Sequence, residues 1–230
     1  MPSTTHDDAY QGFEQGPIRP PSEADSLLIR VTRNCPWNRC RFCPVYKGRR
    51  FALRPVAHVL EDIDRVQRYV AAIKASVGEG GRLSPEDVRR IGEAVTPSDQ
   101  GALQAALQWR AGGMRSIFLQ DANSLVIKPA DLRRILEHLR ACFPWVGRIT
   151  SYARSHTVAR IADADLAAFA AAGLNRIHIG LESGSDRVLA RMQKGVTKAA
   201  HIKAGRKIKQ AGMALSEYVM PGLGGRDLSR

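Results

Sequence analysis

Short apolar segments alternate with longer helical patterns along this 230-residue chain, from Ser26 almost to its end. Such an alternation is typical of repeated βα units, whose strands lie side by side in one parallel sheet. Five strands are predicted, with the residues LLIRVTR (27–33), SIFLQ (116–120), RITSYA (148–153), RIHIGLE (176–182) and ALSEYVM (214–220). The sequence therefore predicts an α/β fold with one large parallel-sheet domain over residues 27–230.

Helical patterns fill the segments between the predicted strands. Helices are predicted over 56–73, 130–141, 163–173 and 185–211, the last with a break at Gly195. Between the first two strands, Ser84 is predicted to cap a further helix that begins at Pro85, with Asp87 completing a capping box. A further helical stretch, GALQAALQWRAGG (101–113), leads into the second strand. These additional helices are either a lid or extra packing beside the sheet.

A polar loop follows every predicted strand. In parallel α/β proteins these loops meet at one rim, where ligands bind and chemistry occurs. Behind the first strand lies a cysteine-rich loop, and the later strands are followed by QDANS, SYARS, LESGSD and PGLGG. Five such loops in register predict a shared active-site rim.

The first 26 residues are rich in acidic, proline and small polar side chains. They contain no apolar stretch long enough for a secretory signal or a membrane span. We therefore predict a flexible arm over 1–26 and a cytoplasmic protein with no membrane partner.

The net charge of +13 is concentrated in two stretches without acidic residues, 26–60 and 187–216. A basic surface of this kind attracts nucleic acid or a polyanionic substrate. However, no RNA-binding motif or interleaved aromatic residues accompany the charge, and basic helices often serve solubility alone. Nucleic acid is therefore a possible but less favoured partner.

Three of the four cysteines, Cys35, Cys40 and Cys43, lie within nine residues in a C-x4-C-x2-C pattern. In a reducing compartment such a cluster indicates metal binding rather than disulfides. A structural zinc site needs a fourth protein ligand, and neither His58 nor Cys142 has the usual paired spacing, so zinc requires an additional assumption. A plant-type [2Fe–2S] centre has the same spacing but would need Cys142 as its fourth ligand. Cys142 is predicted to be a small buried apolar residue. A [4Fe–4S] cluster with one open iron needs only three thiols.

The histidines receive no functional assignment from the sequence. His58, His138 and His201 fall in helical patterns and are predicted to lie on the surface. His178 alternates within the fourth strand and is predicted to face the helices.

The segments CPWNRCRFC, FLQDANSL and IHIGLESGSDRVL together resemble the radical S-adenosylmethionine (radical SAM) superfamily. The chain is most similar to the branch that contains Elongator-type, methylthiotransferase and coproporphyrinogen-oxidase-like core domains, over residues 27 to about 225. The resemblance implies a partial TIM-like (βα)6 barrel, here ending after the fifth strand. The missing sixth unit indicates either a C-terminally truncated form or an unusually open barrel.

The resemblance also implies a [4Fe–4S] cluster held by Cys35, Cys40 and Cys43, with S-adenosylmethionine bound to the open iron. An external one-electron reductant such as flavodoxin or ferredoxin would drive its cleavage to methionine and a 5′-deoxyadenosyl radical, which abstracts hydrogen from an unknown substrate. The usual family spacing is C-x3-C-x2-C, so the extra residue here indicates a variant subgroup. The alternative to this enzymatic function is a non-catalytic iron–sulfur or zinc module. The secondary alternative is a radical SAM enzyme that modifies tRNA.

Four residues of the rim are implied to hold the methionine part of S-adenosylmethionine. Asp121 and Asn123 stand where the family has its Gly-Gly-Glu segment and are candidates for the amino group, although QDAN departs from that motif. Ser151 and Arg154 are candidates for the carboxylate.

Five further residues are implied to surround the nucleoside part. Phe42 matches the aromatic residue near the adenine, and the backbone from Met220 to Gly222 flanks it. Glu182 and Ser183, at the end of the fourth strand, resemble the polar pair placed against the ribose.

Overall fold

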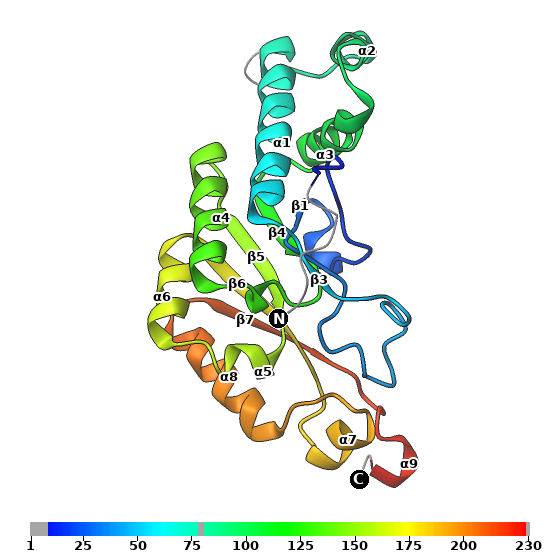
Figure 1. Cartoon of the computed structure of the whole chain (residues 1–230), viewed down its shortest axis with the longest axis vertical. Helices are drawn as coiled ribbons and strands as arrows, with labels where there is room; N and C mark the ends of the chain where they lie inside the picture. Colours follow the sequence, from blue (N-terminus) through cyan, green and yellow to red (C-terminus); the bar gives the residue numbers. More distant parts are fainter. Residues whose placement is uncertain (1–8, 78–80, 229–230) are drawn as a thin grey trace.

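Five parallel strands organise the computed structural model, which describes residues 9–77 and 81–228 (Figure 1). In their spatial order they are β1 (Leu27–Arg30), β4 (Ser116–Gln120), β5 (Arg148–Ala153), β6 (Leu174–Glu182) and β7 (Ala214–Val219). Each strand pairs in parallel with its neighbour. The α/β fold and its five predicted strands are therefore confirmed.

Helices cover one face of this sheet. The helices of the described residues are α1 (Val56–Val77), α2 (Pro85–Glu93), α3 (Gln100–Ala111), α4 (Pro129–Cys142), α5 (Ser155–Val158), α6 (Asp163–Ala171), α7 (Asp186–Arg191), α8 (Lys198–Gln210) and α9 (Gly225–Leu228), and not all of them lie on the sheet. Figure 1 shows α1, α4, α6 and α8 side by side along the sheet. The hydrophobic core lies between these helices and one set of alternating strand residues, which includes Ile29, Leu119, Ile149 and Ile177. This arrangement is that of a partial barrel.

The other face of the sheet carries an aromatic cluster. Phe118, Tyr152, His178 and Tyr218 come from four neighbouring strands, and their rings lie 5.0–6.3 Å apart in successive contacts. The prediction that His178 faces the helices is therefore wrong. Its neighbours in the sequence, Ile177 and Ile179, occupy the helix-facing positions, and side chains alternate along a strand.

The first strand is shorter than predicted. β1 ends at Arg30, and the chain then leaves the sheet, so that β2 (Thr32–Arg33) pairs antiparallel with β3 (Ala52–Leu53). This two-stranded ribbon closes the base of the cysteine loop, which spans residues 34–51. The ribbon fixes where the loop leaves and rejoins the fold.

The extra helices between β1 and β4 are packing elements. The predicted capping box is present, since the Ser84 hydroxyl accepts from the Asp87 amide at 3.1 Å and the Asp87 carboxylate accepts from the Ser84 amide at 3.0 Å. α2 has no buried residue, whereas α3 inserts the fully buried Trp109 into the core. Figure 1 places α2 away from the cysteine loop, so it is not a lid over that loop.

Residues 9–26, predicted to belong to a flexible arm, are instead held against the sheet. Glu14 forms ion pairs with Arg30 and Arg54, and the Tyr10 hydroxyl donates to Asp62 at 2.6 Å. Glu23 is fully buried, and its Oε1 lies 3.2 Å from Nε2 of His178 on the aromatic face. These buried polar contacts outweigh the low hydrophobicity of the segment.

Glu23 is charged in this setting. Burial alone raises the pKa of its carboxyl, but hydrogen bonds from His178 and Ser26 lower it below its usual value. Residues 1–8 of the predicted arm lie outside the described residues. The domain boundary at residue 27 stays a prediction.

His201, predicted to lie on the surface, is buried and makes stability depend on pH. Its Nδ1 lies 2.6 Å from the Ser155 hydroxyl, and burial, aided by the charge of Lys194, lowers its pKa to about 4. An unfolded histidine has a pKa of about 6.5 and takes up a proton first, so acid favours unfolding. We expect the free energy of unfolding to fall by roughly 3 kcal/mol from pH 6.5 toward pH 4 through this group.

Urea unfolding of the protein and of a His201→Gln variant, at about pH 7 and about pH 4.5, measures this dependence. Other groups also titrate in this range, so the variant isolates the contribution of His201. The variant should lose less stability on acidification. An equal loss in both proteins would show that His201 is not the responsible group.

Candidate functional site

The three predicted cysteine ligands lie together on the cysteine loop. Cys35, Cys40 and Cys43 are partly exposed and form no disulfide. Asn34 and Asn38 adopt left-handed backbone conformations, with φ of 65° and 44°, that asparagine tolerates better than most residues. Their side-chain amides donate across the loop, to Arg50 O at 2.6 Å and to Tyr46 O at 2.5 Å respectively. The loop is therefore held by its own polar contacts.

Asp121 holds the cysteine loop in place through hydrogen bonds. It is fully buried, and its Oδ2 accepts from Arg30 Nη2 at 2.8 Å and from the Asn34 amide at 3.0 Å. Its Oδ1 accepts from the hydroxyl of Tyr46, whose pKa is raised by burial and by this carboxylate. Both oxygens thus accept hydrogen bonds from the protein itself and support the loop, while contact of Asp121 with the amino group of a ligand stays a prediction.

Asn123 and Ser151 are also occupied by the protein. Asn123 is buried, accepts from the Arg154 amide at 3.0 Å and donates to Thr157 Oγ1 at 2.9 Å, which fixes the turn from β5 into α5. Ser151 is fully buried and donates to the Tyr152 carbonyl at 3.1 Å. It lies between Thr150 and Tyr152 and so points to the helix-facing side of β5. The polar atoms of both side chains thus make hydrogen bonds within the protein, and their contact with methionine stays a prediction.

Two cations from distant parts of the chain lie beside the thiols. Arg154 Nη2 donates to the carbonyl of Lys194 at 2.9 Å, and Lys194 Nζ donates to Glu182 Oε1 at 3.0 Å. Burial raises the pKa of the Cys40 thiol, while the charges of Lys194 and Arg154 act to lower it. Burial lowers the pKa of Arg154, against the opposing effect of Cys35 and Cys40. Both cations are therefore close enough to favour thiolates and to attract an anionic ligand.

Lys194 was missed as a site residue by the sequence patterns, which include it in a helical segment. α7 ends at Arg191 and α8 begins at Lys198, so Lys194 lies in the connection between them. The available signal is the next residue, Gly195, whose φ is 66°. Glycine in this conformation commonly follows the end of a helix.

Glu182 occupies the strained end of β6. Its φ is 64°, and the register with β7 shifts between Gly180 and Glu182. A β-bulge of this kind redirects the side chain at a sheet edge. A Cβ at Gly180 would lie 2.3 Å from Glu182 Oε1, so glycine leaves room for the carboxylate and its partner Lys194. Glu182 is thus held at the rim by Lys194, and its contact with a ligand stays a prediction.

The remaining predicted residues line the same rim. The ring centroid of Phe42 lies 5.4 Å from Lys194 Nζ, and the Ser183 hydroxyl accepts from the Ser185 amide at 3.2 Å. Met220 is exposed and its amide donates to Glu182 O at 3.0 Å, while Gly222 forms the turn after β7 with a φ of 77°. The structure therefore brings the ends of β6 and β7 together.

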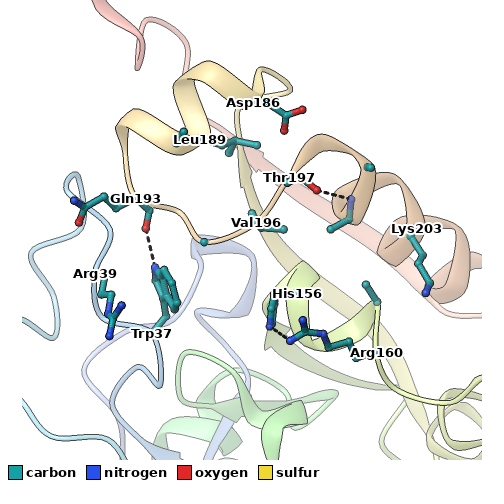
Figure 2. Close-up of a pocket in the computed structure, with 15 residues that line it drawn as sticks. Trp37, Arg39, His156, Arg160, Asp186, Leu189, Gln193, Val196, Thr197 and Lys203 are labelled. Atoms are coloured by element: carbon teal, nitrogen blue, oxygen red, sulfur yellow. Dashed lines mark hydrogen bonds between the residues drawn. The ribbon is translucent and has the colours of Figure 1, made fainter.

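Trp37 docks the cysteine loop on the connection between α7 and α8. Its indole Nε1 donates to Gln193 O at 2.7 Å, as Figure 2 shows, and the Arg41 amide donates to Met192 O at 3.0 Å. A Cβ at Gly195 would lie 2.3 Å from the indole ring, so only glycine allows this contact. The guanidinium of Arg154 lies 4.8 Å from the centroid of the same indole ring.

A groove of about 960 Å³ opens beside this contact. Figure 2 shows Trp37 and Arg39 on one side and His156 and Arg160 on the other. Its lining also includes Lys203 and one acidic residue, Asp186. The groove is therefore basic and borders the cysteine loop.

The three loop cysteines suit a metal centre bound by thiolates. Their thiols are free and partly exposed, and they lie on one short loop. Three thiolates fit an iron–sulfur cluster that leaves one iron open to another ligand.

The sequence-family model of the Radical SAM superfamily matches residues 29–229 of this chain. This chain therefore belongs to the radical SAM superfamily, and the predicted family is confirmed. Its branch within the superfamily stays a prediction. No curated protein sequence matches the chain significantly.

Two solved radical SAM enzymes share its fold. Cobalamin-dependent OxsB, with aqua-cobalamin and S-adenosylmethionine bound, has a TM-score of 0.53 at 20% identity and covers 85% of this chain. The methyltransferase TsrM from Kitasatospora setae, with cobalamin and a [4Fe–4S] cluster bound, has a TM-score of 0.50 at 18% identity and covers 86%. The matched regions are only 24% of the OxsB chain and 32% of the TsrM chain.

A search for membrane-spanning segments gave a negative result. Within the described residues, no helix combines the length and apolar character that crossing a bilayer requires.

Proposed function

We propose that this protein is a radical SAM enzyme whose Cys35, Cys40 and Cys43 hold a [4Fe–4S] cluster. The observation that carries the proposal is the group of three free thiols at the rim with Arg154 and Lys194 beside them. Membership of the superfamily supports the same assignment. When bound and reduced, the cluster supplies the electron that splits S-adenosylmethionine into methionine and a 5′-deoxyadenosyl radical, which takes hydrogen from the substrate.

The residues around the thiols suggest how S-adenosylmethionine is oriented. Its carboxylate is an anion, and Arg154 and Lys194 are the cations that approach the thiols. Glu182 and Ser183 accept hydrogen bonds and suit the ribose hydroxyls. This assignment keeps Arg154 in its predicted role and adds Lys194 to the set.

The adenine is proposed to lie between Phe42 and the backbone of Met220 to Gly222. Phe42 is partly exposed, and Met220 and Gly222 are exposed. An aromatic ring and free backbone groups can contact the face and the edge of a purine. Asp121, Asn123 and Ser151 are left out of the proposed ligand contacts because the protein already occupies their polar atoms.

Replacing Arg154 with glutamine is expected to weaken S-adenosylmethionine binding about 10- to 100-fold. The reason is the loss of a charged hydrogen bond, worth roughly 1.5–3 kcal/mol. The KM for S-adenosylmethionine measures the effect, and iron content should stay unchanged. Arg160→Gln is the matched control, because Arg160 lies on the same side of the fold and pairs with His156. Equal KM values for both variants would remove Arg154 from the proposed site.

Anaerobic reconstitution and reduction with dithionite test the proposed reaction. The enzyme should form 5′-deoxyadenosine from S-adenosylmethionine, whereas a non-catalytic iron–sulfur or zinc module would form none. Replacing dithionite with reduced flavodoxin or ferredoxin in this assay tests the proposed electron donor. Substrates can then be sought by their ability to accelerate cleavage.

The basic groove favours a second candidate, a radical SAM enzyme that modifies tRNA. Arg39, Arg160 and Lys203 line it against the single acid Asp186, and Trp37 offers a ring for stacking. Binding of tRNA should then weaken steeply with salt and be reduced by Arg160→Glu. Absent or salt-insensitive binding would rule out this candidate.

A further inference from the structure

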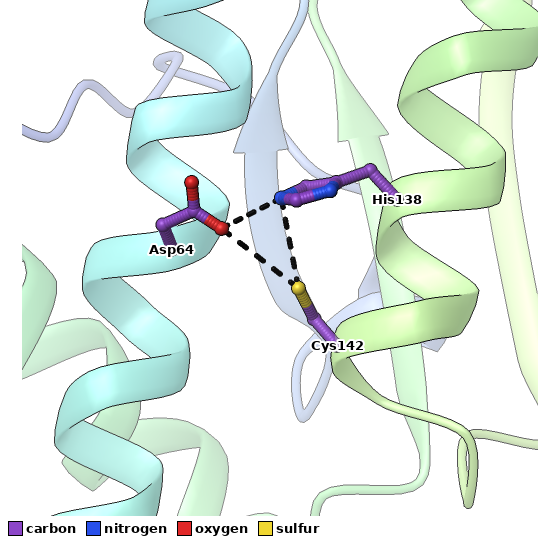
Figure 3. Close-up of side chains that lie close together, drawn as sticks. All are labelled: Asp64, His138 and Cys142. Carbon is purple, nitrogen blue, oxygen red and sulfur yellow. Dashed lines mark hydrogen bonds and ion pairs between the residues drawn. The ribbon is translucent and has the colours of Figure 1, made fainter.

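Three potential metal ligands outside the cysteine loop converge between two helices. Asp64 comes from α1, whereas His138 and Cys142 come from α4, as Figure 3 shows. His138 and Cys142 are four residues apart, so their side chains lie on the same side of α4, one turn apart. The three ligand atoms lie within 4.8 Å of one another, and no other described trio of His, Cys, Asp or Glu does so.

The distances within this trio suit one small ion. Cys142 Sγ lies 3.6 Å from His138 Nε2 and 3.9 Å from Asp64 Oδ1. Ligand atoms around a tetrahedral zinc ion are about 3.3–3.5 Å apart, given Zn–N and Zn–O bonds of about 2.0 Å and Zn–S bonds of about 2.3 Å. His138 Nε2 and Asp64 Oδ1 are 2.6 Å apart in a direct hydrogen bond. That pair alone would need to open, by about 0.7 Å.

One side of the trio is buried and the other is exposed to solvent. Cys142 is buried, whereas the side chains of His138 and Asp64 are 31% and 47% exposed. The buried Cys142 thiol therefore lies on the apolar side of the ion position. Solvent reaches that position from the side of His138 and Asp64. An open coordination site filled by water completes such an arrangement.

We propose that Asp64, His138 and Cys142 bind a divalent zinc ion, with water as the fourth ligand. The mixed nitrogen, sulfur and oxygen donor set is one that zinc accepts. Binding replaces the proton of the Cys142 thiol, which is released to solvent, and His138 shifts its ring proton to Nδ1. The ion would join α1 to α4 on the outer layer of the fold, away from the cysteine loop (Figure 1).

Cobalt(II) is a direct probe because its bond to a thiolate gives a charge-transfer absorption. The full chain has four cysteines, so a variant with Cys35→Ala, Cys40→Ala and Cys43→Ala retains only Cys142. Adding cobalt chloride should give this variant a thiolate-to-cobalt band at one ion per chain, displaced by zinc. Absence of the band, with the variant folded, would overturn the proposal.

Two further substitutions in that background test the other ligands and the origin of the band. Cys142→Ser should abolish the band, and His138→Ala should weaken cobalt binding at least 10-fold. His58→Ala is the matched control and should leave binding unchanged, because His58 also lies on α1 but packs against the ring of Tyr10, outside the trio. A band that survives Cys142→Ser, or equal affinity after His138→Ala and His58→Ala, would contradict the assignment.

Should the triple-alanine variant fail to fold, the cluster-loaded protein serves the same test, because its loop thiols are already occupied. Cobalt binding to that protein should then be lost in Cys142→Ser alone. In the triple variant, zinc at about 100 times its Kd should also raise Tm by roughly 5–10 °C. None of these readouts depends on cleavage of S-adenosylmethionine, so the two proposals can fail separately.

Discussion

The Cys40→Ala variant is expected to lose its iron after anaerobic reconstitution, from about four atoms per chain to near zero. Cys40 lies between Cys35 and Cys43 on the loop, and its removal leaves two thiols, too few to hold the cluster. Iron and sulfide analysis, together with the visible absorption of the cluster, measures the effect. S-adenosylmethionine cleavage should disappear with the iron.

Cys142→Ala is the matched control for this experiment. It also removes one of the four cysteines, but Cys142 lies at the end of α4 in contact with Asp64 and His138. Its iron content should equal that of the unmodified protein. Loss of iron in Cys142→Ala, or its retention in Cys40→Ala, would show that the cluster ligands are wrongly assigned.

The Asp121→Ala variant is expected to unfold with a free energy about 3–5 kcal/mol lower than that of the unmodified protein. The substitution leaves the partly buried Arg30 without its fully buried carboxylate partner, with only Glu14 remaining beside it, and removes the acceptor of the Tyr46 hydroxyl. It also frees the Asn34 amide at the start of the cysteine loop. Urea unfolding measures the loss, and cluster retention should decrease with it.

Glu86→Ala is the control, because Glu86 forms an exposed ion pair with Arg89 that contributes little to stability. The experiment separates loop support from ligand binding at Asp121. If Asp121 held S-adenosylmethionine instead, the variant would keep its stability and iron while its KM for S-adenosylmethionine increased.

Much of the sheet could be predicted from the sequence because its strands are apolar and short. β4 and β5 match their predicted residues, and the rim follows from the position of each loop after a strand. β1 was predicted too long because Val31 and Thr32 continue the apolar pattern. The chain instead turns there to pair with β3, a choice set by the returning end of the cysteine loop.

The site was only partly predictable because its polar contacts join residues far apart in sequence. Asp121 has the residue type of a ligand, yet Arg30 and Tyr46 from β1 and the cysteine loop occupy its carboxylate. Lys194 lies beside the thiols in a connection that contacts the cysteine loop through Trp37 and Gln193 and that also bonds Arg154 and Glu182. Gly195 indicates the end of the helix there, but not which residues the connection contacts.

The distribution of charged residues along the sequence also predicted the charge of the surface only in part. The stretch 26–60 has no acidic residue, but its arginines find partners elsewhere. Arg30 and Arg54 pair with Glu14 of the N-terminal segment, and Arg54 also pairs with Asp62 of α1. Part of the positive charge of this stretch is therefore neutralised within the fold, while Arg39 lines the groove.

Formation of 5′-deoxyadenosine by the reconstituted, reduced protein is the measurement on which the proposed function depends. We predict that the iron-loaded protein converts S-adenosylmethionine to 5′-deoxyadenosine and methionine, and that the Cys40→Ala variant does not. A protein that carries stoichiometric zinc without iron, or an iron-loaded protein that yields no more 5′-deoxyadenosine than Cys40→Ala, would contradict the assignment of this chain as a radical SAM enzyme.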